Sequence, residues 1–171
     1  MSEDPDYSRS YGGAALGARL RRVSERIDRD STRVYAARDV RFEQRWYGVL
    51  RQLAANGPMS VGEIAAVLRI THVSVSEASR SLEKAGLVAS SATAQDGRRR
   101  NLDLTPEGRA LVDELSPLWE AFHAAAQDLN DEAGDIVKLL DRLDDALARR
   151  SMFERIMDRI GPDLAKPIDS M

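Results

Sequence analysis

Residues 59–108 read MSVGEIAAVLRITHVSVSEASRSLEKAGLVASSATAQDGRRRNLDLTPEG, and the rest of the chain is arranged around them. Ser60 and Glu63 have the spacing of a capping box, in which the serine hydroxyl accepts from a first-turn amide and the glutamate bonds back to the serine amide. A short helix is therefore predicted to follow Ser60. Its inner face carries apolar residues at helical spacing, namely Ile64, Ala65 and Leu68.

A second helix is predicted directly after a tight turn at Arg69 and Ile70. Thr71 has the side chain to cap this helix, and Gly86 offers the left-handed conformation that often ends one. The predicted helix has one apolar stripe and a polar remainder; the stripe consists of Val75, Ala78 and Leu82. Two short helices joined by a tight turn, the second of them amphipathic, are typical of a helix-turn-helix unit.

A β-hairpin is predicted to follow the two helices. Leu87-Val88 and residues 102–104 are short strand-like runs, and Asp96-Gly97 between them is a turn signal. Thr105 and Pro106 then provide a cap and a first-turn proline, which restart a helix. A hairpin in this position turns the helix-turn-helix unit into its winged form.

The order and spacing of these motifs resemble the winged helix-turn-helix core of the MarR family of bacterial transcriptional regulators. The motifs are Ser60-Val61, Glu63-Ile64-Ala65, Val75-Ser76, Leu82-Glu83-Lys84, Gly86-Leu87-Val88, Asp96-Gly97-Arg98-Arg99 and Leu104-Thr105-Pro106-Glu107-Gly108. Residues 20–28, followed by Arg45-Trp46-Tyr47, also look like the MarR half of fusions to GNAT acetyltransferases. The chain after residue 108 is short and helical in pattern, so we expect the regulator half alone.

Long helices are predicted on both sides of this core. We expect a mainly α protein with a small β-hairpin (α+β), in which residues 14–162 form one MarR-like domain between a mobile tail at 1–13 and a second tail at 163–171. The winged core spans 42–108, and the flanking helices span 14–38 and 106–160. Pro117 is expected to kink or interrupt the second flank, and Asn130 or Asp131 to cap its next helix.

The flanking helices carry more apolar surface than so small a core can cover. In the first of them the apolar stripe consists of Leu16, Leu20, Val23, Ile27 and Val34. A symmetric homodimer that packs the two sets of helices together would bury these stripes. The MarR resemblance implies the same arrangement, with two second helices placed about one helical turn (~34 Å) apart on a pseudo-palindromic DNA site.

The charge distribution is compatible with double-stranded DNA as a partner, despite a net charge of −3. Residues 1–59 hold 11 Lys and Arg against 8 Asp and Glu, residues 60–104 hold 6 against 5, and residues 105–171 hold 8 against 15. The acidity therefore lies away from the proposed DNA-binding half. The absence of cysteine and of a long apolar run favours a cytoplasmic protein without a membrane span.

The candidate DNA-binding residues lie on the second helix and in the hairpin. On the helix they are Thr71, His72, Ser74, Ser76, Glu77 and Arg80; in the hairpin they are Asp96, Arg98, Arg99 and Arg100. Serine bonds to several bases and glutamate prefers the cytosine amino group, whereas arginine contacts phosphates. Arg98 matches the family's wing arginine, which resembles other minor-groove arginines, and Asp96 would orient it. Alternatively, the polar residues of the helix form only a solvated face, and Asp96 and Arg98 form only a surface ion pair.

A small-molecule site is expected at Arg45, Trp46 and Tyr47, because MarR-like proteins bind small aromatic or phenolic anions between the dimer helices and the winged unit. An aromatic pair here is also compatible with simple core packing. Two histidines without cysteines give no metal-site spacing, and no phosphate loop or catalytic triad is present. We therefore expect no cofactor, no metal and no enzymatic activity.

The sequence thus predicts a homodimeric, effector-responsive transcriptional repressor that binds a pseudo-palindromic operator. The alternative is a winged-helix protein-interaction module that does not bind DNA.

Overall fold

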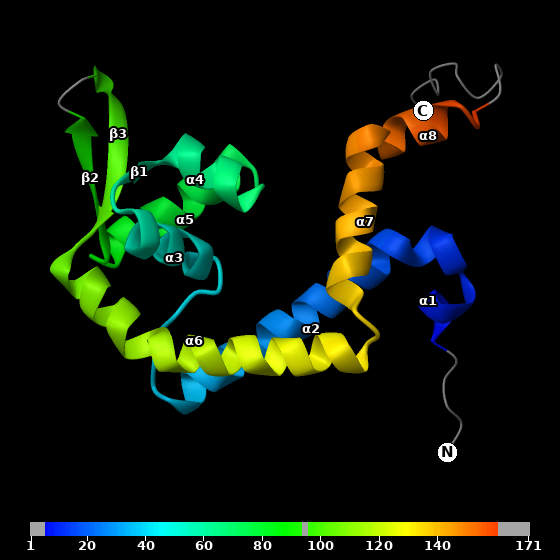
Figure 1. Ribbon diagram of the computed structural model, residues 1–171, viewed down its shortest axis with the longest axis horizontal. Coiled ribbons are helices and arrows are strands. Elements are labelled where there is room, and N and C mark those ends of the chain that lie inside the picture. Colours follow the sequence, from blue (N-terminus) through cyan, green and yellow to red (C-terminus); the bar gives the residue numbers. More distant parts are fainter. Residues whose placement is uncertain (1–5, 94–95, 161–171) are drawn as a thin grey trace, which may run out of the picture. The chain divides into compact units, whose positions relative to one another are not determined.

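The computed structural model describes residues 6–93 and 96–160. It is mainly helical with one small antiparallel sheet, which confirms the predicted fold class (Figure 1). The chain divides into two compact units, Met1–Glu114 and Leu115–Met171. Within the described residues, no helix has the length and apolar content needed to cross a membrane.

The first unit begins with helical structure in the segment that was expected to be a mobile tail. A short helix α1 (Tyr7–Ser10) and a 3₁₀ turn η1 (Gly12–Ala15) precede the long helix α2 (Leu16–Ala37). Asp6 caps α1 by accepting from the Ser8 amide at 3.0 Å, and it also pairs with Arg22 of α2 at 2.9 Å. The hydrogen bond from Arg22 holds the pKa of Asp6 well below its usual range. These contacts tie the described part of residues 1–13 to α2.

An aromatic cluster joins the end of α2 to helix α3 (Trp46–Asn56). The rings of Tyr35 and Phe42 stack with centroids 4.5 Å apart, and Phe42 meets Trp46 edge-on at 5.7 Å. All three side chains are buried. Phe42 therefore packs into this cluster ahead of α3, which begins at Trp46.

The helix-turn-helix consists of α4 (Val61–Leu68) and α5 (His72–Lys84) (Figure 1). The predicted capping box is present: the Glu63 amide donates to Ser60 Oγ at 3.2 Å, and the Ser60 amide donates to Glu63 Oε2 at 2.7 Å. The Ser74 amide donates to Thr71 Oγ1 at 3.1 Å, which confirms the second cap. Gly86 has a φ of 74°, the left-handed conformation expected after α5.

A three-stranded antiparallel sheet in the order β1-β3-β2 forms the wing and its base. The hairpin strands β2 (Val88–Thr93) and β3 (Asp96–Leu104) are longer than predicted. Val88 pairs with Leu104 at the base of the hairpin. A third, two-residue strand β1 (Met59–Ser60), not predicted from the sequence, pairs Met59 with Leu102.

A single apolar core holds the winged unit together. The side chains that are almost fully buried come from α3, α4 and α5: Val49, Leu50, Leu53, Ile64, Val75 and Leu82. The apolar stripes predicted for α4 and α5 are therefore the faces that pack. Burying side chains of this size contributes about 1.5–3 kcal/mol each.

Helix α6 (Pro106–Glu132) starts in the first unit and extends into the second. The Gly108 amide donates to Thr105 Oγ1 at 3.0 Å, while the Thr105 hydroxyl donates to the Gly86 carbonyl at 2.7 Å. Thr105 therefore caps α6 and also attaches it to the end of α5. The helix continues through Pro117, so the predicted interruption does not occur there.

The second unit contains α7 (Ile136–Arg149) and α8 (Met152–Met157) in addition to most of α6. The N-cap of α7 is Asp135 rather than Asn130 or Asp131, because α6 continues through both of these residues to Glu132. From within α6, Asn130 Oδ1 accepts from the Val137 amide at 2.9 Å. The continuous helix expected up to residue 160 is instead broken at Ser151, which forms a second capping box with Glu154. The second tail, predicted at residues 163–171, lies outside the described residues.

Candidate nucleic-acid interface

Helix α5 has one buried stripe and one fully outward stripe. Val75, Ala78 and Leu82 are 0–2 % exposed. At 3.6 residues per turn, the opposite side of the helix carries four exposed side chains, Val73, Glu77, Arg80 and Lys84. Glu77 and Arg80 are among the candidate residues predicted from the sequence, whereas Val73 and Lys84 are not, although the same helical spacing indicates all four.

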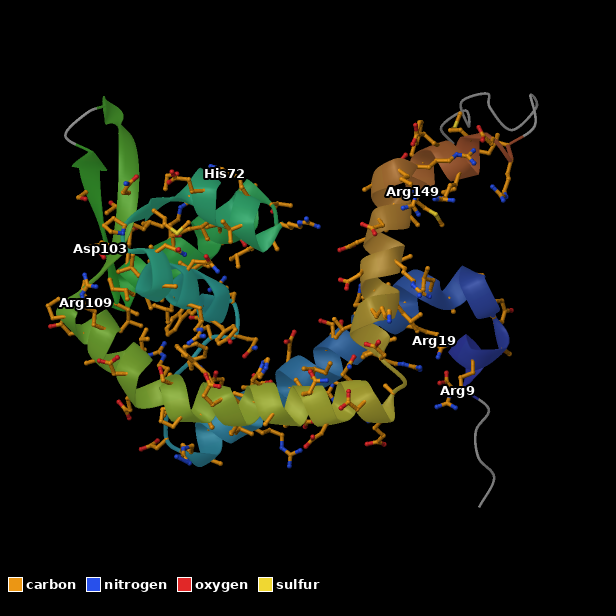
Figure 2. The ribbon with its side chains drawn as sticks, viewed as in Figure 1. Arg9, Arg19, His72, Asp103, Arg109 and Arg149 are labelled. Atoms are coloured by element: carbon orange, nitrogen blue, oxygen red, sulfur yellow. The ribbon has the colours of Figure 1, made fainter. Side chains whose placement is uncertain are left out.

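The start of α5 is held by its own hydroxyl groups. Thr71 Oγ1 and Ser74 Oγ are 2.8 Å apart and share a hydrogen bond, in addition to the cap from the Ser74 amide. His72 is exposed in the first turn (Figure 2). Ser76 is half-buried on the flank of the outward stripe. The first turn therefore presents a rigid set of small side chains at the positive end of the helix dipole.

The four wing candidates lie on β3. Asp96, Arg98, Arg99 and Arg100 all belong to this strand, and Arg100 pairs with Ala92 of β2. Their side chains lie outside the described part of the structure, so their expected roles stay predictions. At the base of the hairpin Asp103 pairs with Arg109 of α6 at 3.1 Å (Figure 2).

Glycine is required where α6 passes the base of the wing. Gly108 is buried, and a Cβ added to it would overlap the carbonyl group of Leu87. This close approach, together with the Asp103–Arg109 pair, fixes the hairpin relative to the start of α6. The wing and the end of α5 are therefore both attached to the start of α6.

Glu43 connects the segment before α3 to α5. Its Oε1 accepts from the Ser81 hydroxyl at 2.9 Å, and its Oε2 contacts the Arg45 guanidinium at 2.6 Å. Burial alone would raise the pKa of Glu43, but the hydrogen bonds from Ser81 and Arg45 and the charges of Arg45 and Arg41 outweigh burial and lower it. Glu43 is therefore a carboxylate that orients Arg45 and holds the middle of α5.

A cavity of about 770 Å³ lies beside α5, over the same segment. Four cationic side chains and two carboxylates line it: Arg41, Arg45, Arg80, Lys84, Glu43 and Glu77. Trp46 also lines it, so two of the three residues expected in an effector pocket are here, whereas Tyr47 does not line this cavity. The buried Trp46 Nε1 has no hydrogen-bond partner in the described part of the chain.

The cavity has the chemistry of an anion site rather than a metal site. Four cations around one hollow attract a negatively charged group, and an indole wall packs against an apolar ring. Within residues 6–93 and 96–160 no group of three or more His, Asp or Glu side chains is placed to hold a metal ion. Arg41, Glu43 and Lys84 were missed because they reach the cavity only when the segment before α3 packs on α5.

Residues 42–99 match the sequence model of the MarR family, which spans the winged unit just described. Through this segment the chain is similar to the MarR family. The wing, the two capped helices and their order agree with the resemblance seen in the sequence. Among curated proteins, none matches the sequence significantly.

Solved structures extend the likeness beyond the winged unit. One of them is BpsR of Bordetella bronchiseptica, whose structure was described for the regulation of its DNA binding by 6-hydroxynicotinic acid. BpsR is 26% identical to this chain; the match covers 76% of this chain and 93% of BpsR, with a TM-score of 0.62. The MarR family regulator NMB1585 of Neisseria meningitidis is 26% identical, with coverages of 85% and 96% and a TM-score of 0.55.

The fold is also that of S. aureus MepR, solved as a DNA complex. MepR is 22% identical, with 77% of this chain and 97% of that chain covered and a TM-score of 0.64. The MarR family and these structural neighbours are transcriptional regulators rather than enzymes, as the sequence of this chain predicted.

Proposed function

We propose that this protein is a homodimeric repressor of the MarR family that binds a pseudo-palindromic operator through α5 and releases it on binding a small aromatic or phenolic anion. The observation that carries the proposal is the geometry of α5. Its inner stripe is buried in the core, its first turn is capped, and its outer stripe is exposed. A helix held in this way beside a β-hairpin is suited to enter the major groove of DNA.

The exposed face of α2 supports the homodimer. Its apolar stripe remains 37–52 % exposed, although it has the spacing of a packed surface; it consists of Leu16, Leu20, Val23, Ile27 and Val34. Helices α7 and α8 also expose large apolar side chains, among them Leu139, Leu140, Phe153 and Ile156. Apolar surface of this kind normally marks an interface. A second copy of the chain offers the same surfaces, as a two-fold dimer requires.

The contacts with DNA divide into two classes. We propose that Ser76, Glu77 and His72 meet base edges and that Arg80 and Lys84 meet phosphates. Thr71 and Ser74 act mainly by fixing the first turn, because their hydroxyl groups are bonded to each other. The wing residues Asp96, Arg98, Arg99 and Arg100 are proposed to contact the neighbouring minor groove and backbone.

The cavity supports an effector that is an aromatic or phenolic anion. Such a ligand would place its negative group near Arg45 and its ring against Trp46, and BpsR provides a relative whose DNA binding responds to an aromatic acid. Arg80 and Lys84 line the cavity and also lie on the outward stripe of α5. A bound anion would therefore compete with DNA phosphates for the same charges and favour a state that binds DNA less tightly.

The proposal is tested by selecting operators from randomised duplex DNA with the purified full-length protein at moderate salt. Enrichment of an inverted repeat with half-site centres one helical turn apart is the expected result. Its affinity should fall steeply with salt. Absence of enrichment at every salt concentration, together with a stable complex with another protein, would instead favour the winged-helix protein-interaction module.

The effector is tested on the selected operator with a panel of aromatic and phenolic acids and their neutral amides. Acids that release DNA should raise the midpoint of thermal unfolding, and the amides should not. Arg45→Ala should abolish both effects while leaving operator binding intact. An acid that releases DNA equally well from Arg45→Ala would show that the effector binds elsewhere.

A further inference from the structure

Val73 is the most exposed large apolar residue of the winged unit. Its side chain is 66% exposed, and it is the second residue of α5. A β-branched residue loses rotamer freedom in a helix, and at this exposure it gains little from packing in return. The position therefore does not serve the stability of the isolated fold.

The direction of Val73 is set by the buried stripe of α5. Val75, Ala78 and Leu82 point into the core, and at 100° per residue Val73 lies on the opposite side of the helix. Glu77 follows one turn later and Arg80 two turns later on the same outward stripe. Val73 is thus the first side chain of the surface that enters the groove if α5 binds DNA.

Thymine carries the apolar group that a major groove offers to such a side chain. Its C5-methyl projects into the groove, and an apolar side chain that covers it distinguishes thymine from cytosine without a hydrogen bond. The polar residues around Val73 would meanwhile bond to neighbouring base edges. We propose that Val73 is a specificity-determining residue that packs on the 5-methyl group of one thymine in each half-site. This inference rests on the proposed DNA-binding function.

The test replaces thymine by uracil, which removes only the methyl group. Each thymine of the selected operator is changed in turn, and the affinity of the full-length protein is measured for each duplex. At one thymine position per half-site the wild-type protein should lose about fourfold in affinity, the value expected for uncovering one methyl group. Substitution in both half-sites together should cost roughly fifteenfold.

The same series with Val73→Ala identifies the residue responsible. This variant should bind the thymine and uracil operators equally well, because the side chain that covers the methyl group is gone. Val67→Ala is the matched control, since Val67 is a valine 57% exposed on α4 rather than α5. It should retain the wild-type response to uracil. Thermal unfolding of each variant shows that the fold is unchanged.

The outcomes separate this inference from the function on which it rests. If each thymine-to-uracil change alters the affinity of Val73→Ala and of wild type by the same factor, the role of Val73 is overturned. DNA binding itself would then still stand. An operator in which no thymine-to-uracil change weakens binding by the wild type would also overturn the role of Val73. Failure to select any operator would overturn the proposed function, and the role of Val73 with it.

Discussion

The Glu43 carboxylate accepts a hydrogen bond from the Ser81 hydroxyl at 2.9 Å, across 38 positions of sequence. This contact attaches the segment before α3 to the middle of α5. The other Glu43 oxygen contacts Arg45, which lines the cavity. A single carboxylate therefore links the proposed effector site to the helix that is proposed to read DNA.

The Glu43–Ser81 contact should be measurable as a coupling energy. In a double-mutant cycle with Glu43→Gln and Ser81→Ala, we expect a coupling of about 1 kcal/mol, since a hydrogen bond to a charged group is strengthened but this one is partly exposed. Urea unfolding of the four proteins at pH 7 gives the value. A coupling indistinguishable from zero would mean that the contact does not position α5.

The same coupling should depend on pH in a defined direction. The pKa of Glu43 is lowered in the folded protein, so the stabilisation is complete above the ordinary glutamate pKa of about 4.3 and is lost as the pH falls through the lowered value. Repeating the cycle at successively lower pH should therefore show the coupling decreasing. A coupling that grows on acidification would contradict the assignment of Glu43 as the charged partner.

Gly108→Ala should destabilise the winged unit. The added Cβ would overlap the Leu87 carbonyl, so α6 and the base of the wing would have to separate. Overpacking of this kind costs about 1–3 kcal/mol. Gly62→Ala is the control: it lies in α4, a Cβ there would meet only Ser60 Oγ at an ordinary contact distance of 4.0 Å, and alanine should stabilise by about 0.5–1 kcal/mol. Thermal unfolding of both variants checks the opposite signs; equal effects would contradict the close approach.

The elements that the sequence predicted correctly depend on residues close to each other in the chain. The capping box of Ser60 and Glu63, the cap at Thr71 and the left-handed Gly86 are local, and the structure contains all of them. Strand β1 could not be foreseen in this way, because Met59 pairs with Leu102, far along the chain. The cavity likewise forms only when the segment before α3 packs against α5.

One incorrect prediction, the continuous helix through Ser151, had a competing signal in the sequence. The helix break at Ser151 is marked by a capping box with Glu154, but the apolar periodicity around it favoured one continuous helix. Val73 fits helical periodicity as an outward residue, although it is not among the candidate residues predicted from the sequence. The Asp6–Arg22 pair that orders the start of the chain is a tertiary contact, which composition alone does not indicate.

Arg80→Ala and Lys84→Ala should each weaken DNA binding with little change in sequence preference. Removing one phosphate contact from each subunit of a dimer should lower the slope of log affinity against log salt by about 2. Arg29→Ala, on the polar face of α2, is the control and should leave the slope unchanged. Operator titrations across a salt series provide the measurement. An unchanged slope in both α5 variants would remove these residues from the phosphate-contacting set.

Ile27→Asp should convert the proposed homodimer into monomers. Ile27 lies in the middle of the apolar stripe of α2 and is 49% exposed in the isolated chain, so a dimer that packs on this stripe would bury the new carboxylate without a partner. The isolated fold should tolerate the change for the same reason. Ala18→Asp places the same charge on the opposite face of α2 and should leave the dimer intact. Sedimentation equilibrium measures the association, and operator titration should show that the monomeric variant binds the two half-sites without cooperativity. If Ile27→Asp remains as dimeric as wild type, the stripe of α2 is not part of the interface.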